Sequence, residues 1–523
     1  MKVRSNIQSS PTSSVNDTHS WASAGICIDG RVPVSRWQTD HVGSTSDDAA
    51  LIAELVDRLG HDRVHHSSVD RALHRRDASL IDVGESGPIC FPRSTAEVVA
   101  CVQVARRHDR PFVARGAGTG LAGGAVPLEG AVVIVTTRMD AVLSIDAENL
   151  VAWVEPGVVN LDLSRRLAPL RLHFAPDPSS QQACTIGGNV ANNSGGPHCL
   201  ALGVTSAHVL AVEVVLPDGE VAMLGGLDPD PVGYDLRGAF VGGEGTLGIA
   251  TRIAVRLTPN PVEVRTMLLG FGQVDDAAAT VSGIIGAGVV PAAIEMMDAL
   301  ITRAAEDFVH AGYPLDAAAI LLVEVDGPPA RVAADVEVVE RVAREHRVGS
   351  VRLASDAAER ELLWKGRKSA FGAVARVMPN YYLHDTVVPR RRLVEVMRQV
   401  YEIAARHDLL VMNVFHAGDG NLHPLLMFDG REPGVLERVH AAGAEIVAAS
   451  LAAGGVLSGE HGIGLEKQSF MELQFSSDDL AAQARLRAAF DPYGRSNPGK
   501  VLPLGASCAD VASLRRVPDG TWI

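Results

Sequence analysis

Three glycine-dense stretches, each beside an apolar strand-like run, constrain the fold of this chain more than any other feature. They are RGAGTGLAGGA (115–125), IGGNVANNSGG (186–196) and VGGEGTLG (241–248). Backbone amides approach an anion closely at glycine, because no Cβ intervenes. One such stretch alone is as consistent with a purely structural turn as with a binding loop. Three together favour loops whose backbone groups bind one large ligand. A pyrophosphate is the expected ligand of the first loop.

The first stretch also matches the dinucleotide-binding pattern GxGxxG, and Asp140 follows it at about the expected distance of 20 residues. That pattern requires a helix that opens inside the glycines. Here Gly123, Gly124, Pro127 and Gly130 follow directly, so no helix is expected. We therefore interpret the stretch as a backbone anion nest and not as a Rossmann turn.

A second feature predicts a metal site. His416 and His423 flank a Gly/Asp/Asn turn between two apolar runs, which is typical of a β-hairpin. Further along, Glu460 and His461 lie in the glycine-rich segment GEHGIG. Two histidines and one carboxylate are a common ligand set for a divalent cation with an open coordination position. His461 then serves as a base or as a fourth ligand.

Composition excludes several classes of protein. The net charge of −15 argues against nucleic-acid binding, which needs a basic face. No run of about 18 apolar residues predicts a membrane span, and no apolar segment near the start predicts a secretory signal. The six cysteines form no CxxC pair, so we expect buried free thiols in a reducing cytosol and no iron–sulfur cluster.

The pattern of apolar residues divides the chain near Pro259 and Pro261. We predict a disordered extension over residues 1–45, a first domain over 46–261, a second over 262–503 and a tail over 504–523. In the first domain, Ser94 and Glu97 predict a capping box and a helix to about 107, and strands are expected at 111–114, 131–136, 151–155, 209–216 and 251–257. The second domain is expected to be α+β with an antiparallel sheet, with strands at 266–271 and 319–325 and helices at 275–286, 298–310 and 330–345.

The motifs together resemble a known family. RGAGTGLAGGA, TIGGNVANNSGG and FVGGEGTLGI resemble the FAD-binding half of the vanillyl-alcohol-oxidase superfamily. FHAGDGNLHP, SGEHGIG and NPGK (497–500) are similar to its 2-hydroxyacid dehydrogenase branch, as are LWKGRKSAF (363–371), YYLHD (381–385) and PRR (389–391), which resemble the FAD-linked subunit of bacterial glycolate oxidase. The resemblance covers about 50–505. It implies a PCMH-type FAD-binding domain with two subdomains, followed by an α+β substrate domain.

The resemblance also implies which residues bind FAD. Thr119 stands where members with covalent FAD carry a histidine, so non-covalent FAD is expected. The residues assigned to the cofactor are Arg115, Gly116, Ala117, Gly118, Thr119, Gly120, Leu121, Gly123, Gly124, Pro176, Thr185, Gly187, Gly188, Asn189, Ala191, Asn193, Ser194, Gly195, Gly243, Glu244, Gly245, Thr246, Gly248, Ile249 and Asn497.

For the reaction, we assign His416, His423 and Glu460 to a divalent metal, with zinc expected and manganese or iron as alternatives. His461 is the expected base. Arg367 is expected to pair with a substrate carboxylate, or else to be a structural ion-pair partner. Asn421 is expected to orient the site from beside it. Lys365 and His384 are expected to be either substrate contacts or solvated side chains.

The predicted reaction is the FAD-dependent oxidation of a small 2-hydroxyacid, glycolate or D-lactate, to the 2-oxoacid. Phe371 and Leu383 stand where some relatives that act on dicarboxylates carry polar contacts, which favours a monocarboxylate. D-2-hydroxyglutarate or another D-2-hydroxyacid, a non-catalytic flavin subunit and a hydrolase that uses only the metal are the alternatives. The resemblance implies a second flavin-fold subunit and an iron–sulfur subunit, or another electron acceptor, as partners. We expect the chain in the cytoplasm, or at the membrane through its partners.

Overall fold

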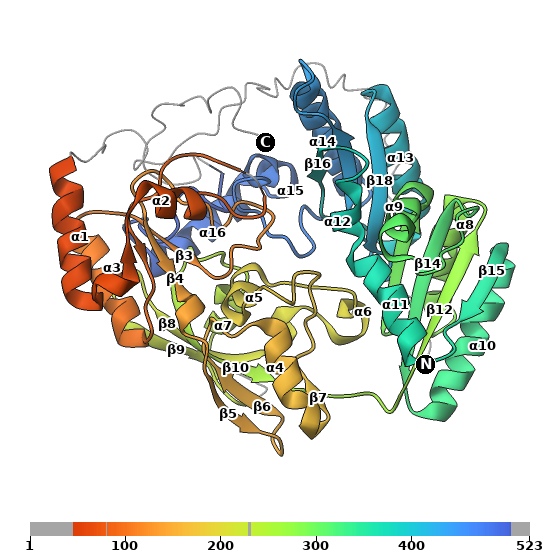
Figure 1. The fold of residues 1–523 in the computed structure, drawn as a ribbon, viewed down its shortest axis with the longest axis horizontal. Coiled ribbons are helices and arrows are strands. Elements are labelled where there is room, and N and C mark those ends of the chain that lie inside the picture. Colours follow the sequence, from red (N-terminus) through yellow and green to blue (C-terminus); the bar gives the residue numbers. More distant parts are fainter. Residues whose placement is uncertain (1–44, 80, 229–231, 504–523) are drawn as a thin grey trace, which may run out of the picture.

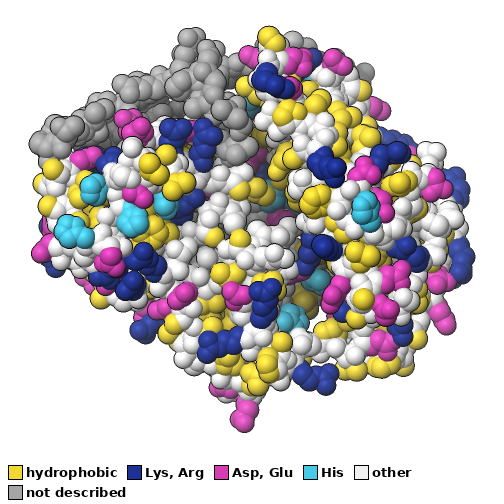
Figure 2. Space-filling model, viewed as in Figure 1, with side chains coloured by type: hydrophobic (Ala, Val, Ile, Leu, Met, Phe, Trp, Pro, Cys, Tyr) yellow, Lys and Arg dark blue, Asp and Glu magenta, His cyan; other side chains and the backbone are white. Residues whose placement is uncertain are grey.

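A computed structural model describes residues 45–79, 81–228 and 232–503. The predicted tail, and the predicted N-terminal extension up to residue 44, lie outside the described residues. The described chain forms two lobes, drawn as a ribbon in Figure 1 and as a space-filling view of the same face in Figure 2. The N-terminal lobe carries a four-stranded sheet, a five-stranded sheet and the two-stranded pair β7 (Leu172–His173) and β11 (Thr258–Pro259), and the second lobe is built on one large sheet. No helix in the described ranges is long and apolar enough to cross a bilayer.

The first sheet of the N-terminal lobe has the strand order β1-β2-β4-β3. Helix α3 packs beside it and begins at Ser94, whose Oγ accepts the Glu97 N–H. The predicted capping box is only half formed, because the Glu97 carboxylate accepts the Arg93 N–H instead. The elements are α1 (Thr45–Leu59), β1 (Val64–His65), α2 (Ser68–His74), β2 (Ile89–Cys90), α3 (Thr95–Arg107), β3 (Phe112–Arg115) and β4 (Val132–Val135).

The second sheet of this lobe is antiparallel, with the order β5-β6-β10-β8-β9. Its strands present a buried aliphatic face to α4 and α5. The elements are β5 (Val142–Asp146), β6 (Val151–Val154), α4 (Asn160–Leu167), α5 (Ile186–Asn192), α6 (Cys199–Leu202), β8 (Val209–Val215), β9 (Val221–Gly225), α7 (Leu236–Phe240) and β10 (Ile249–Arg256).

The second glycine stretch corrects one interpretation, because residues 186–192 form helix α5 and not a loop. The Thr185 side chain caps it by accepting the Gly188 N–H, and Asn193 ends it in the left-handed conformation. Ile186 and Val190, four residues apart, are buried on one face. Capping and burial of this face outweigh the low helix propensity of the glycines. The first stretch forms no helix, as predicted.

The second lobe is built on a sheet with the order β15-β12-β14-β13-β18-β19-β17, and β16 joins through β20. Alternate residues of β12 face opposite layers: Met267 packs toward α8, α10, α13 and α14, and Leu268 toward α9, α11 and α12. The strands are β12 (Glu263–Phe271), β13 (Ala293–Asp298), β14 (Ala319–Gly327), β15 (Val348–Leu353), β16 (Asn380–Leu383), β17 (Thr386–Val387), β18 (Leu410–His416), β19 (Asn421–Leu422) and β20 (Pro424–Phe428).

The helices of the second lobe cover both faces of this sheet, so its strands are long apolar runs. They are α8 (Val274–Gly286), α9 (Ala299–Val309), α10 (Pro329–Glu345), α11 (Ala357–Lys368), α12 (Ala370–Val374), α13 (Leu393–Arg406) and α14 (Val435–Ala452). The prediction of an α+β fold with an antiparallel sheet is confirmed.

After the large sheet the chain returns to the first lobe. Helix α16 (Ser477–Phe490) lies beside the N-terminal elements in Figure 1. The Phe112 N–H donates to the Arg495 carbonyl, and Phe112 forms an isolated bridge with Ser496. The Lys500 ammonium, fully buried, donates to the Val126 carbonyl. The last described residues therefore belong spatially with the first lobe, although they follow the second in sequence.

Candidate metal and flavin site

The predicted hairpin carries the two histidines. Strand β18 pairs with β19 through His416 and Asn421, and with β20 further along. The turn between them needs a glycine at position 420, because its φ is +72° and a Cβ there would collide with the Val388 carbonyl. The turn thus holds both imidazoles at one end of the sheet, with His416 and His423 buried.

The three predicted metal ligands converge. Glu460 Oε1 lies 3.1 Å from His416 Nε2 and 3.3 Å from His423 Nε2. Ligand atoms about 2.1 Å from a tetrahedral zinc ion are separated by ~3.4 Å. Both distances from Glu460 are close to this value, and all three ligand atoms lie within 4.8 Å of one another. In the described residues, these three form one of two groups that could hold a metal ion.

The Nδ1 atoms of the same two histidines each contact an oxygen atom of another residue. His416 Nδ1 lies 2.7 Å from Glu295 Oε1, and His423 Nδ1 lies 3.2 Å from the His384 carbonyl oxygen. A carboxylate or carbonyl behind a histidine sets its tautomer and leaves the other nitrogen for a metal. Both Nε2 atoms are therefore the ones that face Glu460.

Arg367 lies in the layer behind the ligands. Its side chain is fully buried, and Nη2 lies 2.6 Å from Glu295 Oε2. The structure therefore brings Arg367 to the site through Glu295, which also supports His416. The predicted contact of Arg367 with a substrate carboxylate stays a prediction, whereas the alternative of a structural ion pair matches the contact with Glu295.

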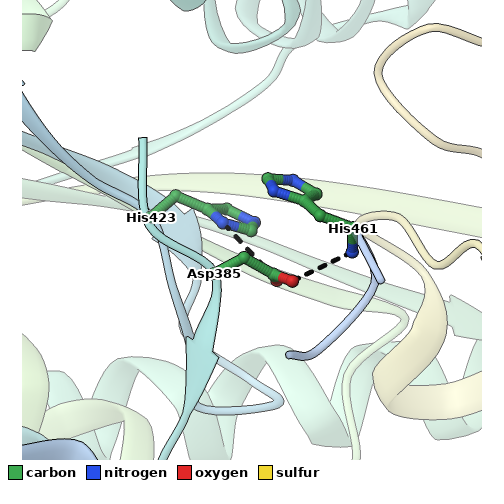
Figure 3. Close-up of side chains that lie close together, drawn as sticks. All are labelled: Asp385, His423 and His461. Atoms are coloured by element: carbon green, nitrogen blue, oxygen red, sulfur yellow. Dashed lines mark hydrogen bonds and ion pairs between the residues drawn. The ribbon is translucent and has the colours of Figure 1, made fainter. Parts of the chain in front are cut away.

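Asp385 holds the segment that carries Glu460 and His461 (Figure 3). Its buried carboxylate accepts the N–H groups of Gly459, Glu460 and His461, and the Ser458 hydroxyl. Lys467 Nζ donates to the same carboxylate over 3.1 Å. These donors fix the backbone of the segment, and with it the direction of both side chains.

Asp385 is also part of the second group of potential metal ligands, with His423 and His461. The imidazoles of His423 and His461 are stacked, with ring centroids 5.0 Å apart (Figure 3). We favour the His416, His423 and Glu460 group for the metal, because the Asp385 oxygens already accept several hydrogen bonds. His423 Nδ1, the atom nearer Asp385, is likewise held by the His384 carbonyl.

The pKa values of the histidines at this site are strongly perturbed. Burial opposes a charge on His416, but Glu295 and Glu460 outweigh it and raise the pKa of His416 to about 10. Burial lowers the pKa of His461 to about 4, against the attraction of Asp385. His461 is therefore neutral near pH 7, which is the form that a base requires.

Residues of the first lobe complete the site. The Glu244 carboxylate accepts the N–H groups of Ile463 and Gly464, just after His461. A Cβ at Gly195 would lie 2.8 Å from Glu460 Oε2, so the residues after helix α5 contact the ligand segment directly. The Asn497 side chain joins the first and third glycine stretches by donating to the Gly124 and Glu244 carbonyls.

A cavity of about 490 Å³ in the first lobe tests the fit of a flavin nucleotide. Six of its lining residues are glycines, and Arg115 also lines it, with its guanidinium donating to the Arg76 and Ala125 carbonyls. These features suit a phosphate-bearing ligand. The predicted FAD residues that line it are Arg115, Gly116, Gly187, Gly188, Ala191, Gly243, Gly245, Gly248 and Ile249.

Several important contacts were missed by sequence reasoning. Glu295 could have been noticed, since it is a charge inside the apolar strand AAIEMM (292–297) and a buried charge needs a partner. Asp385 and Lys467 gave no such signal, because their pairing joins distant segments. Of the secondary candidates, Lys365 is exposed, whereas the His384 side chain is buried and its solvated interpretation is wrong.

The fold and the site together define a two-domain FAD-linked oxidase. The profile of the family described as "FAD linked oxidases, C-terminal domain" matches residues 260–501, and that described as "FAD binding domain" matches 88–225. The chain belongs to the family of the glycolate oxidase subunit GlcD and the FAD-linked D-lactate dehydrogenases. The predicted family, fold class and enzyme class are thereby confirmed.

Individual relatives match along most of their length. The chain is 47% identical over 426 residues to "Glycolate oxidase subunit GlcD" of Escherichia coli K12, covering 82% of this chain and 85% of the relative. It is 31% identical over 465 residues to "Probable D-lactate dehydrogenase, mitochondrial" of Danio rerio, covering 87% and 92%. Substrate-bound p-cresol methylhydroxylase shares the fold, with a TM-score of 0.74 at 16% identity over 87% of this chain and 97% of that one.

Proposed function

We propose that this chain oxidises a small 2-hydroxyacid, glycolate or D-lactate, to the 2-oxoacid. The observation that carries the proposal is the convergence of His416, His423 and Glu460 beside a neutral His461, against the lobe with the glycine-lined cavity. A 2-hydroxyacid offers a carboxylate and an adjacent hydroxyl, which can chelate one cation. The names of the similar proteins, a glycolate oxidase subunit and a D-lactate dehydrogenase, support this substrate class.

Each residue of the site has its own role in the proposed reaction. Bound FAD would accept hydride from C2 of the substrate, and a cation held by His416, His423 and Glu460 would lower the pKa of the substrate hydroxyl. His461 takes the proton of that hydroxyl. Glu295 and the His384 carbonyl hold the two ligand histidines in the required tautomer. Arg367 supplies positive charge behind Glu295, and we keep its contact with the substrate carboxylate as part of the proposal.

The cofactor assignments belong to this proposal. FAD is bound without a covalent bond by the residues named from the family motifs, and the divalent cation is zinc, with manganese or iron as alternatives. The partners are a second flavin-fold subunit and an iron–sulfur subunit, or another acceptor. The proposed location of the protein is the cytoplasm, or the membrane surface if a partner subunit binds there.

An anaerobic screen tests the proposed substrate. Metal-replete protein with FAD is mixed with glycolate, D-lactate, L-lactate and D-2-hydroxyglutarate, and the flavin absorbance is followed. We expect bleaching by glycolate or D-lactate and the weakest response to L-lactate. Bleaching only by D-2-hydroxyglutarate would move the proposal to the dicarboxylate alternative, and no bleaching by any of the four would refute it.

A separate measurement tests the metal. We expect one equivalent of a divalent metal per chain by elemental analysis, and its loss in His416→Ala together with most of the reduction by substrate. His310→Ala is a matched control, because His310 caps the end of helix α9, away from the cluster. Full metal content and full reduction in His416→Ala would show that the ligand assignment is wrong.

A further inference from the structure

A second cavity, of about 780 Å³, opens between the two lobes. The first lobe contributes Ile81 and Leu121, and the second contributes residues of β16, β20 and α14. None of His416, His423, Glu460 and His461 lines it. It is therefore distinct from the metal site, although both lie where the lobes meet.

The walls of this cavity combine apolar side chains with the polar side chains of Ser79, Asn380, Tyr381, Tyr382, His440 and Glu466. Leu121, Phe428, Leu436 and Val439 supply the apolar part. The Tyr382 hydroxyl is hydrogen-bonded to the Glu466 carboxylate there. Such walls suit a flat, largely apolar ring that carries oxygen atoms at its edge.

The cavity also contacts both halves of the proposed reaction centre. Leu121 belongs to the first glycine stretch, and the Glu466 N–H donates to the carbonyl of the next residue, Ala122. On the other side, Glu466 precedes Lys467, which binds Asp385. A ligand here would lie beside the flavin-binding loop, in contact with the segment that carries Glu460.

Electrons taken from a substrate have to leave the chain. The cysteines of the described residues are single free thiols, so they offer no cluster that could store them. Resting on the proposed function, we propose that this cavity binds a quinone, which oxidises the reduced flavin. The quinone gains two electrons and two protons and leaves as the quinol. Anionic reduced flavin, when bound, would supply the two electrons and one proton, and Glu466 would donate the second proton and then be reprotonated from solvent.

The electrostatics agree with this role for Glu466. Burial raises its pKa to about 7, against the attraction of Lys467. A carboxyl group in this range holds and releases a proton near neutral pH. The oxygen atoms of a quinone ring are the acceptors that such a donor, and the Tyr382 hydroxyl beside it, would meet.

The test uses the protein with FAD, without a hydroxyacid. The flavin is reduced by light under anaerobic conditions and then mixed with decylubiquinone, while its absorbance is followed. We expect reoxidation that saturates with quinone concentration. Leu436→Trp, which fills the cavity, should slow it at least about ten-fold. Ala448→Trp, on the exposed face of the same helix α14, should not. Ferricyanide, which needs no cavity, should reoxidise all three proteins alike.

Binding is measured separately by calorimetry with oxidised decylubiquinone. We expect wild type and Ala448→Trp to bind and Leu436→Trp to bind at least ten-fold more weakly; Leu436→Phe replaces it if the larger side chain prevents folding. Glu466→Gln should bind the quinone but reoxidise slowly. Absence of binding by wild type, or equal rates in Leu436→Trp, would overturn the proposal. Light reduction bypasses the substrate, so failure of the hydroxyacid screen leaves this test intact.

Discussion

At the scale of single residues, Glu295 is the most informative side chain of the site. It is buried in strand β13, and its two oxygens meet His416 and Arg367 separately. One carboxylate thus connects His416, a proposed metal ligand, to the Arg367 guanidinium. Loss of such an outer partner typically weakens metal binding, because the ligand imidazole loses both its orientation and some basicity.

We therefore predict that Glu295→Gln weakens metal affinity about 10–100-fold. The amide keeps an oxygen toward His416 but loses the negative charge. Metal affinity is measured by competition with a chromogenic chelator, and FAD content confirms folding. Glu445→Gln, which changes a surface pair with His407, serves as the control and should bind metal normally. Unchanged affinity in Glu295→Gln would remove Glu295 from the metal site.

Asp385 is the second residue whose importance comes from its contacts. Burial opposes its ionisation, but His461 and Lys467 outweigh burial and lower its pKa. Its charge therefore balances the buried Lys467. Removing one partner of a buried pair leaves the other charge uncompensated, which costs about 3–5 kcal/mol.

Asp385→Asn is accordingly expected to destabilise the protein by about 3–5 kcal/mol, measured by chemical unfolding of the protein with FAD. The double variant Asp385→Asn/Lys467→Met removes both charges and should recover a substantial part of that loss. It should not recover reduction by substrate, because the segment 458–464 stays loose. Equal stability of the single and double variants would show that the uncompensated Lys467 charge does not cause the destabilisation.

At the scale of elements, helix α5 shows that glycines allow a helix to pack closely against a neighbouring residue. A Cβ at Gly187 would lie 2.6 Å from the Pro156 Cβ, so the helix rests directly on that proline. Both residues line the glycine-lined cavity. Close packing of the helix here decides the shape of the cavity wall.

We predict that Gly187→Ala weakens FAD binding and destabilises the first lobe by about 1–3 kcal/mol, the usual cost of overpacking. FAD affinity is measured by fluorescence titration of the apoprotein. Gly372→Ala is the matched control: it lies in helix α12 with nothing within 4 Å of its Cβ, and alanine there favours the helix by up to about 1 kcal/mol. Unaltered FAD affinity in Gly187→Ala would contradict the tight contact.

At the scale of the whole molecule, a partly buried ionic contact joins the lobes away from the proposed metal site. His198 Nδ1 lies 2.9 Å from Asp177 Oδ2 in the first lobe, and Nε2 lies 3.4 Å from Glu324 Oε1 in the second. Trp364 Nε1 donates to the other Glu324 oxygen over 2.7 Å. Burial opposes the charge, but Asp177 and Glu324 outweigh it and raise the pKa of His198 well above its usual value.

The raised pKa gives a pH dependence with a definite sign. The stabilisation by charged His198 is complete below its unfolded pKa of about 6.5 and is lost as pH rises through the higher folded value. We expect His198→Gln to lose about 1.5–3 kcal/mol at pH 6 and progressively less in alkaline buffer. Unfolding curves of both proteins at several pH values measure this. His407→Gln, in a surface pair, should change stability by less than about 1 kcal/mol, and a pH-independent difference for His198→Gln would exclude the ionic origin.

The sequence alone determined the local part of this protein. Apolar periodicity and capping residues predicted several of the strands and helices. The His416–His423 turn, the Glu460 segment and the glycine stretches were noticed because the residues of each lie next to one another in the sequence. The structure brought His416, His423 and Glu460 together as expected. The metal itself and the roles of the individual residues stay predictions.

Tertiary structure alone decided everything that joins distant segments. Glu295 behind His416, Lys467 on Asp385, Glu244 on the segment after His461, and the return of Lys500 to the first lobe have no local pattern. Helix α5 likewise forms in a glycine-rich stretch because its apolar face is buried against the second sheet of the first lobe. The physical reason is the same in each case: a buried charge or helix is stable only with its partner, and the fold determines which residue that is.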